Sequence, residues 1–374
     1  MLLMIFPSVN LVSFGSVGIY IKSVNVLSIL LGFFLILFLF KSIQKDTNFK
    51  LIILLLSIAI LYMQRSPVVA FIYMFQLASI MLIPYFFARL NKKIDFNYIF
   101  RFLIYVAILN IFISVASRIF CYQLVINGSI LLNKYGLFYG PYIYAVYLGA
   151  SLIFTFYIKK INYLYIIIIF VALLYSDSRS IAWMFIAFYF FLLLKDNFKN
   201  LIPVTLLMLY IGNILTNKMA LKNIINFDTD SSVAMRVVNY YNYIEWASID
   251  KVLFGGGFQS FLEFAVAYGN RGPIDNLFLR LMAETGLIGF MLFLAINYIV
   301  IKKSYQLFSY SGVVYCKSYN IKLEIIGLIA VIIGIGLFQE SLVVPRSGHI
   351  FYMLFIVIFY TMKDNFRGKP LKLS

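Results

Sequence analysis

The sequence predicts an all-α, polytopic integral membrane protein that forms a single membrane domain over residues 1–374. Hydrophobic residues make up 63% of the 374 residues and charged residues only 12%, which is fewer charges than a soluble domain of this size places on its surface. Apolar runs of about the length that crosses a bilayer recur along the whole chain. Helices are the expected spans, because a helix satisfies its backbone amides within its own segment.

The individual spans follow from the lysine-rich loops that separate the apolar runs. These loops fall at 41–50, 88–95, 159–160, 195–200, 302–322 and 363–374, and basic loops are typical of the cytoplasmic side. A pair of helices fits between each loop and the next. In order, the predicted spans are 4–20, 24–40, 51–63, 68–87, 96–117, 139–158, 161–176, 181–194, 201–215, 283–301, 323–338 and 348–362.

This pairing gives about twelve helices with both termini in the cytoplasm, or eleven if the first segment only dips into the membrane. That first segment lacks a basic start and a small-residue cleavage site, so it is predicted to be an uncleaved span rather than a signal peptide.

The outer connections are predicted near 64–67, 118–138, 177–180, 216–282 and 339–347. The fourth is the only long one, and long ordered loops in compact proteins are usually functional. It mixes Tyr240, Tyr241, Tyr243 and Trp246 with charged residues. We therefore expect short helices lying over the outer surface.

Several other functions are disfavoured by the composition. The net charge of +17 could indicate nucleic acid, but anchoring by cytoplasmic lysines explains it better. Cys121 and Cys316 fall on opposite sides of the predicted membrane, and His349 is the only histidine, so neither a disulfide nor a Cys or His metal site is expected. Asp228 and Asp230 could hold a divalent cation, but acids in a polar loop are more often solvated, and we expect no cofactor.

The distribution of the cations is the most informative feature. Sixteen of the twenty-one lysines lie inside on this topology, whereas seven of the ten arginines lie outside. Arginine presents a planar fork of donors that binds phosphate oxygens in pairs. The outer arginines therefore predict a phosphate or pyrophosphate ligand, and the alternative is that they bind lipid headgroups or outer acids. They are Arg65, Arg118, Arg179, Arg236, Arg271, Arg280 and Arg346.

Arg179 is expected to lie below the outer surface. Only 34 residues separate Lys160 from Lys195, which is barely enough for two crossings at about 1.5 Å per residue. A charge at that depth must face protein or a watery cavity. Asp177 is the alternative, purely structural partner.

A second recessed group lies at the end of the long connection. Asn276, Arg280 and Glu284 are spaced four residues apart and form one polar stripe on a helix that is otherwise apolar. Such a stripe is expected to face inward. Arg280 and Glu284 could also simply satisfy each other as an i, i+4 pair.

Three segments of the chain resemble the signature of the O-antigen polymerase and O-antigen ligase superfamily. They are the run from Ile274 to Gly289, Met235-Arg236 followed by residues 253–258, and Ser178-Arg179-Ser180. The resemblance covers roughly residues 170–300. It implies a multi-spanning glycosyltransferase of the bacterial inner membrane, acting at the periplasmic face on glycans carried by undecaprenyl pyrophosphate. Ligases commonly have a histidine where this chain has Asp275, which favours a polymerase of surface polysaccharide over a ligase.

The mechanism that such an enzyme would require assigns roles to particular residues, two of which also match the family. Arg179 and Arg236 match family arginines and would bind the pyrophosphate, with Arg280 or Arg346 assisting and with Asn276, Arg65, Arg118 and Arg271 in support. A carboxylate would accept the proton of the attacking hydroxyl; Asp275 is the first choice and Glu284 the second, while a simple helix N-cap is the alternative for Asp275. The Gly255–Gly257 run could cradle a phosphate or form a tight turn, and His349 could be a base or a structural residue.

The implied partners are undecaprenyl-pyrophosphate-linked glycans, membrane lipids and, beyond these, a chain-length regulator and a flippase. A flippase or transporter for the same lipid-linked sugars is a competing function. Transporters place polar groups near the bilayer midplane and usually show repeat symmetry. The predicted mid-span positions here are nearly bare of ionisable groups, and the two halves of the chain do not correspond.

Overall fold

The computed structural model of the chain describes residues 10–14, 19–41, 46–63, 67–90, 95–120, 124–126, 129–132, 134–135, 140–158, 162–194, 231–257, 260–267, 276–309, 319–338 and 347–367. In this part of the chain the structure is predominantly helical. The helices are α2 (Ser23–Phe40), α3 (Asp46–Tyr62), α4 (Pro67–Met81), α5 (Ile83–Leu90), α6 (Phe96–Ile119), α7 (Pro141–Tyr157), α8 (Tyr163–Leu174), α9 (Arg179–Leu194), α12 (Ser231–Trp246), α13 (Ile249–Phe254), α14 (Ser260–Ala267), α15 (Leu277–Ser309), α16 (Tyr319–Phe338) and α17 (Ser347–Arg367). Two short antiparallel hairpins join β1 (Asn10–Phe14) to β2 (Ile19–Lys22) and β3 (Leu124–Ile126) to β4 (Ser129–Leu132).

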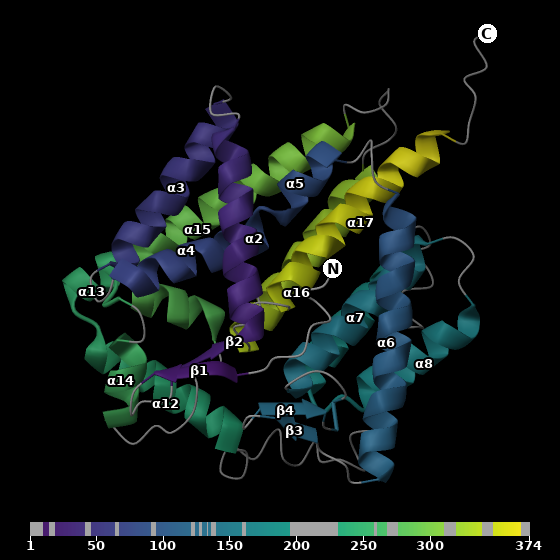
Figure 1. Cartoon of the computed structure of the whole chain (residues 1–374), viewed down its shortest axis with the longest axis horizontal. Helices are drawn as coiled ribbons and strands as arrows, with labels where there is room; N and C mark the ends of the chain where they lie inside the picture. The colour runs from purple at the N-terminus through teal and green to yellow at the C-terminus, as the bar shows by residue number, and fades with distance from the viewer. Residues whose placement is uncertain are drawn as a thin grey trace.

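The long apolar helices pack into one bundle. Buried side chains of α2 to α9 and of α15 to α17 belong to a single hydrophobic cluster. Figure 1 shows α12, α14 and both hairpins gathered in the lower part of the view, whereas the C-terminus lies at the top. The short helices between α9 and α15 therefore cover one end of the bundle.

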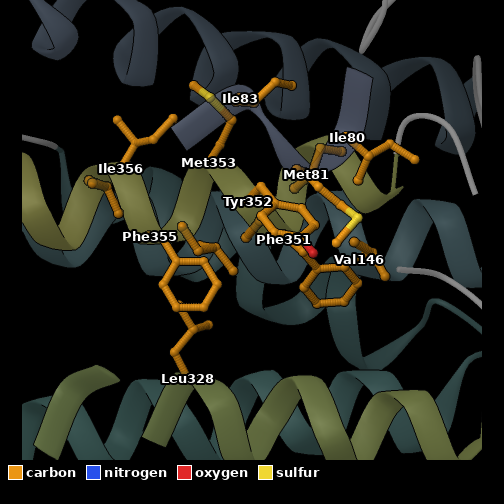
Figure 2. Close-up of a cluster of buried hydrophobic side chains, with 14 of the residues drawn as sticks. Ile80, Met81, Ile83, Val146, Leu328, Phe351, Tyr352, Met353, Phe355 and Ile356 are labelled. Carbon is orange, nitrogen blue, oxygen red and sulfur yellow. The ribbon is translucent and has the colours of Figure 1, made fainter. Parts of the chain in front are cut away.

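Helix α17 is the centre of this bundle. Every side chain from Ile350 to Tyr360 is buried, so the helix has no face left for solvent or lipid over this stretch. Figure 2 shows Phe351, Tyr352, Met353, Phe355 and Ile356 of α17 lying among side chains of the surrounding helices. These neighbours are Ile80 and Met81 of α4, Ile83 of α5, Val146 of α7 and Leu328 of α16.

The outer surface of the bundle is apolar as well. Leu109 and Phe112 of α6, Ile167 of α8 and Ile60 of α3 are all more than half exposed, and contiguous apolar surface of this kind marks contact with a membrane or a partner. Two described helices, Phe96–Ile119 and Leu277–Phe308, have the length and hydropathy of a span, and Ala70–Met81 with Ile83–Leu90 forms a third across a 46° bend. These features support a membrane protein, while twelve spans stay a prediction.

The structure corrects the sequence prediction at the N-terminal segment. Residues 10–14 and 19–22 pair as strands, so the predicted helical span 4–20 is wrong over these residues. Val12, Ile19 and Ile21 are β-branched and favour strands, and Gly15 and Gly18 weaken a helix at this place.

The predicted span 283–301 lies within α15, which begins at Leu277 with the predicted polar stripe and continues to Ser309. Other predictions fall outside the described residues. These are the span 201–215, Cys121, Cys316, Asp228, Asp230, Arg65, Arg271, Asp275 and Arg346.

Candidate functional site

The polar stripe begins at the N-terminus of α15, where Asn276 caps the helix. Its Oδ1 accepts a hydrogen bond from the backbone N–H of Leu279 at 3.0 Å, and its Nδ2 donates to the hydroxyl of Tyr240 at 2.6 Å. An N-cap of this kind stabilises a helix by about 1 kcal/mol. The capping role considered for Asp275 therefore belongs to Asn276, which also ties α15 to α12.

Arg280 and Glu284 form an ion pair inside the bundle. The Nε of Arg280 lies 3.2 Å from Oε1 of Glu284, and its Nη2 donates to the hydroxyl of Tyr73 at 2.7 Å. Tyr62 donates to Oε2 of Glu284 at 3.2 Å. Only 5% of the Glu284 side chain and 16% of the Arg280 side chain are exposed. The prediction that this stripe faces inward is confirmed for Arg280 and Glu284, and the structure also shows the alternative contact, in which the two charges pair with each other.

The two tyrosines bring α3 and α4 into the same network. Tyr62 lies at the end of α3 and Tyr73 lies in α4, and their rings stack with centroids 5.4 Å apart. Sequence reasoning did not find Tyr62 and Tyr73, and it named Tyr240 only as an aromatic residue of the long outer connection. The available signal was a tyrosine at the end of an apolar run, which is also typical of ordinary interface anchoring.

Helix α15 is broken just after Glu284. Gly286 has φ 66° and ψ −173°, which divides the helix in two. The break frees the carbonyls of Ala283 and Glu284, and these accept hydrogen bonds from the N–H groups of Gly256 at 2.9 Å and Gly257 at 3.0 Å. A break in an apolar helix is stable only when neighbouring groups satisfy the freed backbone in this way.

The loop of Gly255–Gly257 packs against the break at Gly286 so closely that neither Gly255 nor Gly286 has space for a side chain. Gly255 has φ 78°, and a Cβ on it would collide with the carbonyl of Glu284. A Cβ on Gly286 would collide with the carbonyl of Leu253. The amide of Gly255 donates to Lys251 at 2.8 Å, so all three glycine amides are committed to backbone carbonyls. The run is a tight turn that holds α15, and the phosphate cradle considered from sequence is not supported.

A small aromatic core lies beside this turn. Trp246 of α12, Phe261 of α14 and Leu279 and Ala283 of α15 are buried together. The ring of Tyr243 lies against both Trp246 and Phe261, with centroids 5.9 and 5.6 Å apart. This core fixes the first half of α15 against the short helices of the long connection.

Side chains near the starts of α9, α15 and α17 lie toward the same end of the bundle. Phe185 of α9 stacks on Phe351 of α17 with ring centroids 5.8 Å apart, and each of these residues lies in the second turn of its helix. At the end of α16, the positions of Gly334 and Gly336 contact Met184 of α9 and Phe278 of α15. Helix N-termini carry partial positive charge, so this arrangement favours an anion.

Each of these three helix starts carries an arginine in the sequence. Arg179 is the first residue of α9, Arg280 lies in the first turn of α15, and Arg346 directly precedes α17. Arg236 occupies the position one turn before Tyr240 in α12, on the helix that Asn276 contacts. For Arg179 and Arg236 the structure gives the backbone position.

Arg118 belongs to a different cluster. Its guanidinium donates to the carbonyls of Lys134 at 3.1 Å and Tyr175 at 3.3 Å, and Asp177 lies 3.9 Å away. Asp177 has φ 60° and pairs more closely with Lys134, at 3.3 Å. The hydrogen bonds that Lys134 makes to Tyr135 and to the carboxylate of Asp177 raise the pKa of Lys134. These contacts indicate a structural role for Arg118, joining the end of α6 to the turn before α9.

His349 is buried in the bundle rather than placed at its surface. One of its ring nitrogens, Nε2, lies 3.1 Å from the hydroxyl of Ser79, which in turn lies 2.6 Å from the hydroxyl of Ser28. This chain of hydrogen bonds joins α2, α4 and α17 and favours the structural interpretation. Among the residues that the structure describes, no group of three or more His, Cys, Asp or Glu side chains is arranged to hold a metal ion.

Comparison with known families gives one match. Residues 164–294 match the family model described as O-antigen ligase. The matched segment runs from α8 into α15 and contains Arg179, Arg236, Arg280 and Glu284. It supports the O-antigen polymerase and ligase superfamily, whose members are membrane enzymes acting on lipid-linked glycans. No curated protein matches the sequence.

Proposed function

We propose that this protein is a membrane glycosyltransferase that polymerises surface polysaccharide from oligosaccharide repeat units carried on undecaprenyl pyrophosphate. The observation that carries this proposal is that side chains near the starts of α9, α15 and α17 lie toward one end of the bundle, and that the sequence has an arginine at or beside each start. The family match supplies the substrate class, since it extends over two of these three starts. In our proposal this end lies at the periplasmic face of the inner membrane, and both termini are cytoplasmic.

The reaction joins an acceptor hydroxyl to C1 of the donor sugar. The new O–C1 bond forms as the bond from C1 to the pyrophosphate oxygen breaks, and the pyrophosphate leaves with the bonding electron pair. The proton of the hydroxyl passes to a carboxylate. Because negative charge grows on the leaving group, donors already aimed at it lower the barrier. The lipid chain holds the leaving group at one depth, which reduces the entropy of alignment.

We assign the pyrophosphate to Arg179 and Arg236, with Arg280 and Arg346 assisting. Asp275 is the proposed proton acceptor. Glu284 is less suited to this role, because it is buried and already accepts hydrogen bonds from Tyr62 and Arg280. We therefore propose Glu284 as a positioning residue that fixes the guanidinium of Arg280.

The test uses purified protein in liposomes with lipid-linked repeat units, and the product is a ladder of polymer. Arg179→Lys keeps the charge but loses the planar fork, so we expect polymer formation to fall by roughly a hundredfold. Arg367→Lys makes the same exchange at the other end of the sequence, near the C-terminus, and should leave the ladder unchanged. Normal ladders from Arg179→Lys would refute the assignment of this arginine.

The ligase is the second candidate, because the matching family model is described by that activity. The two activities differ only in the acceptor, so the same assay with lipid A–core in place of the second lipid-linked unit separates them. A polymerase extends the lipid-linked unit and ignores lipid A–core. A flippase would move the lipid-linked units across the bilayer and form no new glycosidic bond.

A further inference from the structure

A large apolar cavity lies between α15, α16 and α17. It has a volume of about 480 Å³, within the range of small-molecule sites. Leu277, Phe278 and Phe351 line it near the arginine-bearing helix starts, and Lys302 and Tyr305 line it further along α15. The cavity thus runs along the bundle from the proposed pyrophosphate site toward the opposite end.

The cavity has an opening on the side of the molecule. Leu294 of α15 and Ile329 and Ile333 of α16 line it and are 44%, 37% and 47% exposed. These residues face the apolar surface that contacts lipid in a membrane-spanning bundle. A lipid chain can therefore enter from the bilayer without passing through water.

The position of the proposed pyrophosphate site gives the cavity a direction. Leu277 and Phe278, at the start of α15, line the end of the cavity nearest that site. In the proposed function the headgroup lies at this end, and its hydrocarbon chain extends along α15. At the other end, Lys302 donates a hydrogen bond to the hydroxyl of exposed Tyr298 at 3.1 Å.

We infer that this cavity binds the polyprenyl chain of the lipid-linked donor, and this inference rests on the proposed function. A cavity of about 150 Å³ holds one benzene molecule. By that scale, 480 Å³ accommodates about three such rings, or roughly eighteen carbon atoms. This corresponds to the three or four isoprene units nearest the pyrophosphate. The remaining units of the chain extend into the bilayer.

The nature of the walls supports a branched chain as the occupant. Isoleucines and phenylalanines form most of the lining. Isoleucine is stiff at its first side-chain torsion, so these walls have a defined shape and can discriminate between chains. Shape must provide the selectivity, because a bilayer is as apolar as the cavity and burial there adds no hydrophobic driving force.

The first experiment measures transfer from donors that differ only in lipid length, with two, four or eleven isoprene units, in detergent. We expect the KM of the donor to fall by about tenfold from two units to four, which is about 1.4 kcal/mol, and to change little from four to eleven. Ile325→Trp fills the end of the cavity furthest from the helix starts, so it should slow transfer from the four- and eleven-unit donors and leave the two-unit donor unaffected. Ile326→Trp is the matched control, because Ile326 lies on α16 outside the cavity and is 61% exposed. Equal loss by Ile325→Trp with all three donors would overturn the inference.

The second experiment reads binding without catalysis. A polyprenyl phosphate with a photoreactive group on its third isoprene unit should label peptides of α15 and α16. Unlabelled undecaprenyl phosphate should compete with this labelling, and phosphatidylglycerol should not. Equal competition by the phospholipid would identify an ordinary lipid cavity and overturn the inference. If the protein is labelled selectively by the polyprenyl probe but transfers no sugar, the proposed function is refuted and the cavity assignment stands.

Discussion

At the scale of single residues, Glu284 is the side chain on which the proposed site depends. It is buried, it lies 3.2 Å from Nε of Arg280, and it accepts a hydrogen bond from Tyr62. Removing one partner of a buried ion pair is costly because the other charge loses its compensation. Glu284 therefore connects Arg280 to Tyr62 of α3, so the position of the arginine depends on how α3 packs.

Glu284→Gln keeps the size of the side chain and removes its charge. Because Arg280 then lacks a fixed anion, we expect kcat to fall by roughly tenfold to a hundredfold, with a smaller change in the KM of the donor. The measurement is steady-state transfer together with thermal unfolding.

Glu324→Gln provides the matched control for this variant. Glu324 is also buried and accepts a hydrogen bond from Tyr157 at 2.7 Å, but it lies in the first half of α16, away from the helix starts. It should alter stability without a comparable loss of kcat. Similar losses of kcat in both variants would contradict a specific positioning role for Glu284.

Asn276 gives a second prediction at this scale. Asn276→Ala removes both the N-cap of α15 and the hydrogen bond to Tyr240, so we expect the free energy of unfolding to fall by about 2 kcal/mol. Asn162→Ala removes only a cap, since Asn162 caps α8 through the amide of Leu164 at 3.0 Å, and should cost about 1 kcal/mol. Thermal unfolding of both variants measures the difference. If the two costs are equal, the link from α15 to α12 adds no stability.

At the scale of elements, the sequence predicted the polar stripe but not the break that positions it. Four-residue spacing is enough to place Asn276, Arg280 and Glu284 on one face of a helix. The break at Gly286 depends on amides that approach from a loop about thirty residues earlier in the chain. A local pattern carries no information about such a contact, so the sequence did not predict that Gly286 divides this helix.

The hairpin of β1 and β2 illustrates the same limit. Its apolar residues met the composition expected of a span, and hydropathy does not distinguish a strand from a helix in a short apolar run. The candidate tyrosines were missed for a related reason. Tyr62 and Tyr73 acquire their role only when α3 and α4 pack against α15.

Gly286→Ala tests the break directly. The alanine would have to adopt a positive φ, at a cost of about 1–3 kcal/mol, and its Cβ would meet the carbonyl of Leu253. We expect lower thermal stability and faster proteolysis between α13 and α14, because the loop of Gly255–Gly257 loses its hydrogen bonds to the carbonyls of Ala283 and Glu284 in α15. Gly140→Ala is the control, since Gly140 has an ordinary φ of −154°. Unchanged proteolysis of Gly286→Ala would contradict this account.

At the scale of the whole molecule, the proposed function predicts that the end that carries the arginines lies at the periplasmic face. In a protein with Cys121 and Cys316 replaced by serine, Asp250→Cys in exposed α13 should react with an impermeant reagent in spheroplasts. Lys41→Cys at the other end of the bundle should react only after the membrane is opened. Both positions are exposed. The reverse labelling pattern would show that the protein has the opposite orientation in the membrane, and it would refute the proposed site.

The buried state of α17 has a consequence for how the protein is made. This helix follows the other described helices in sequence, yet α4, α5, α7 and α16 pack around it. While a ribosome is still translating the earlier segments, the place of α17 within the bundle is vacant, and the first helices to insert cannot reach their final contacts. Biogenesis should therefore end in a single late assembly step. A premature stop before residue 347 would leave inserted helices that membrane quality-control proteases can degrade.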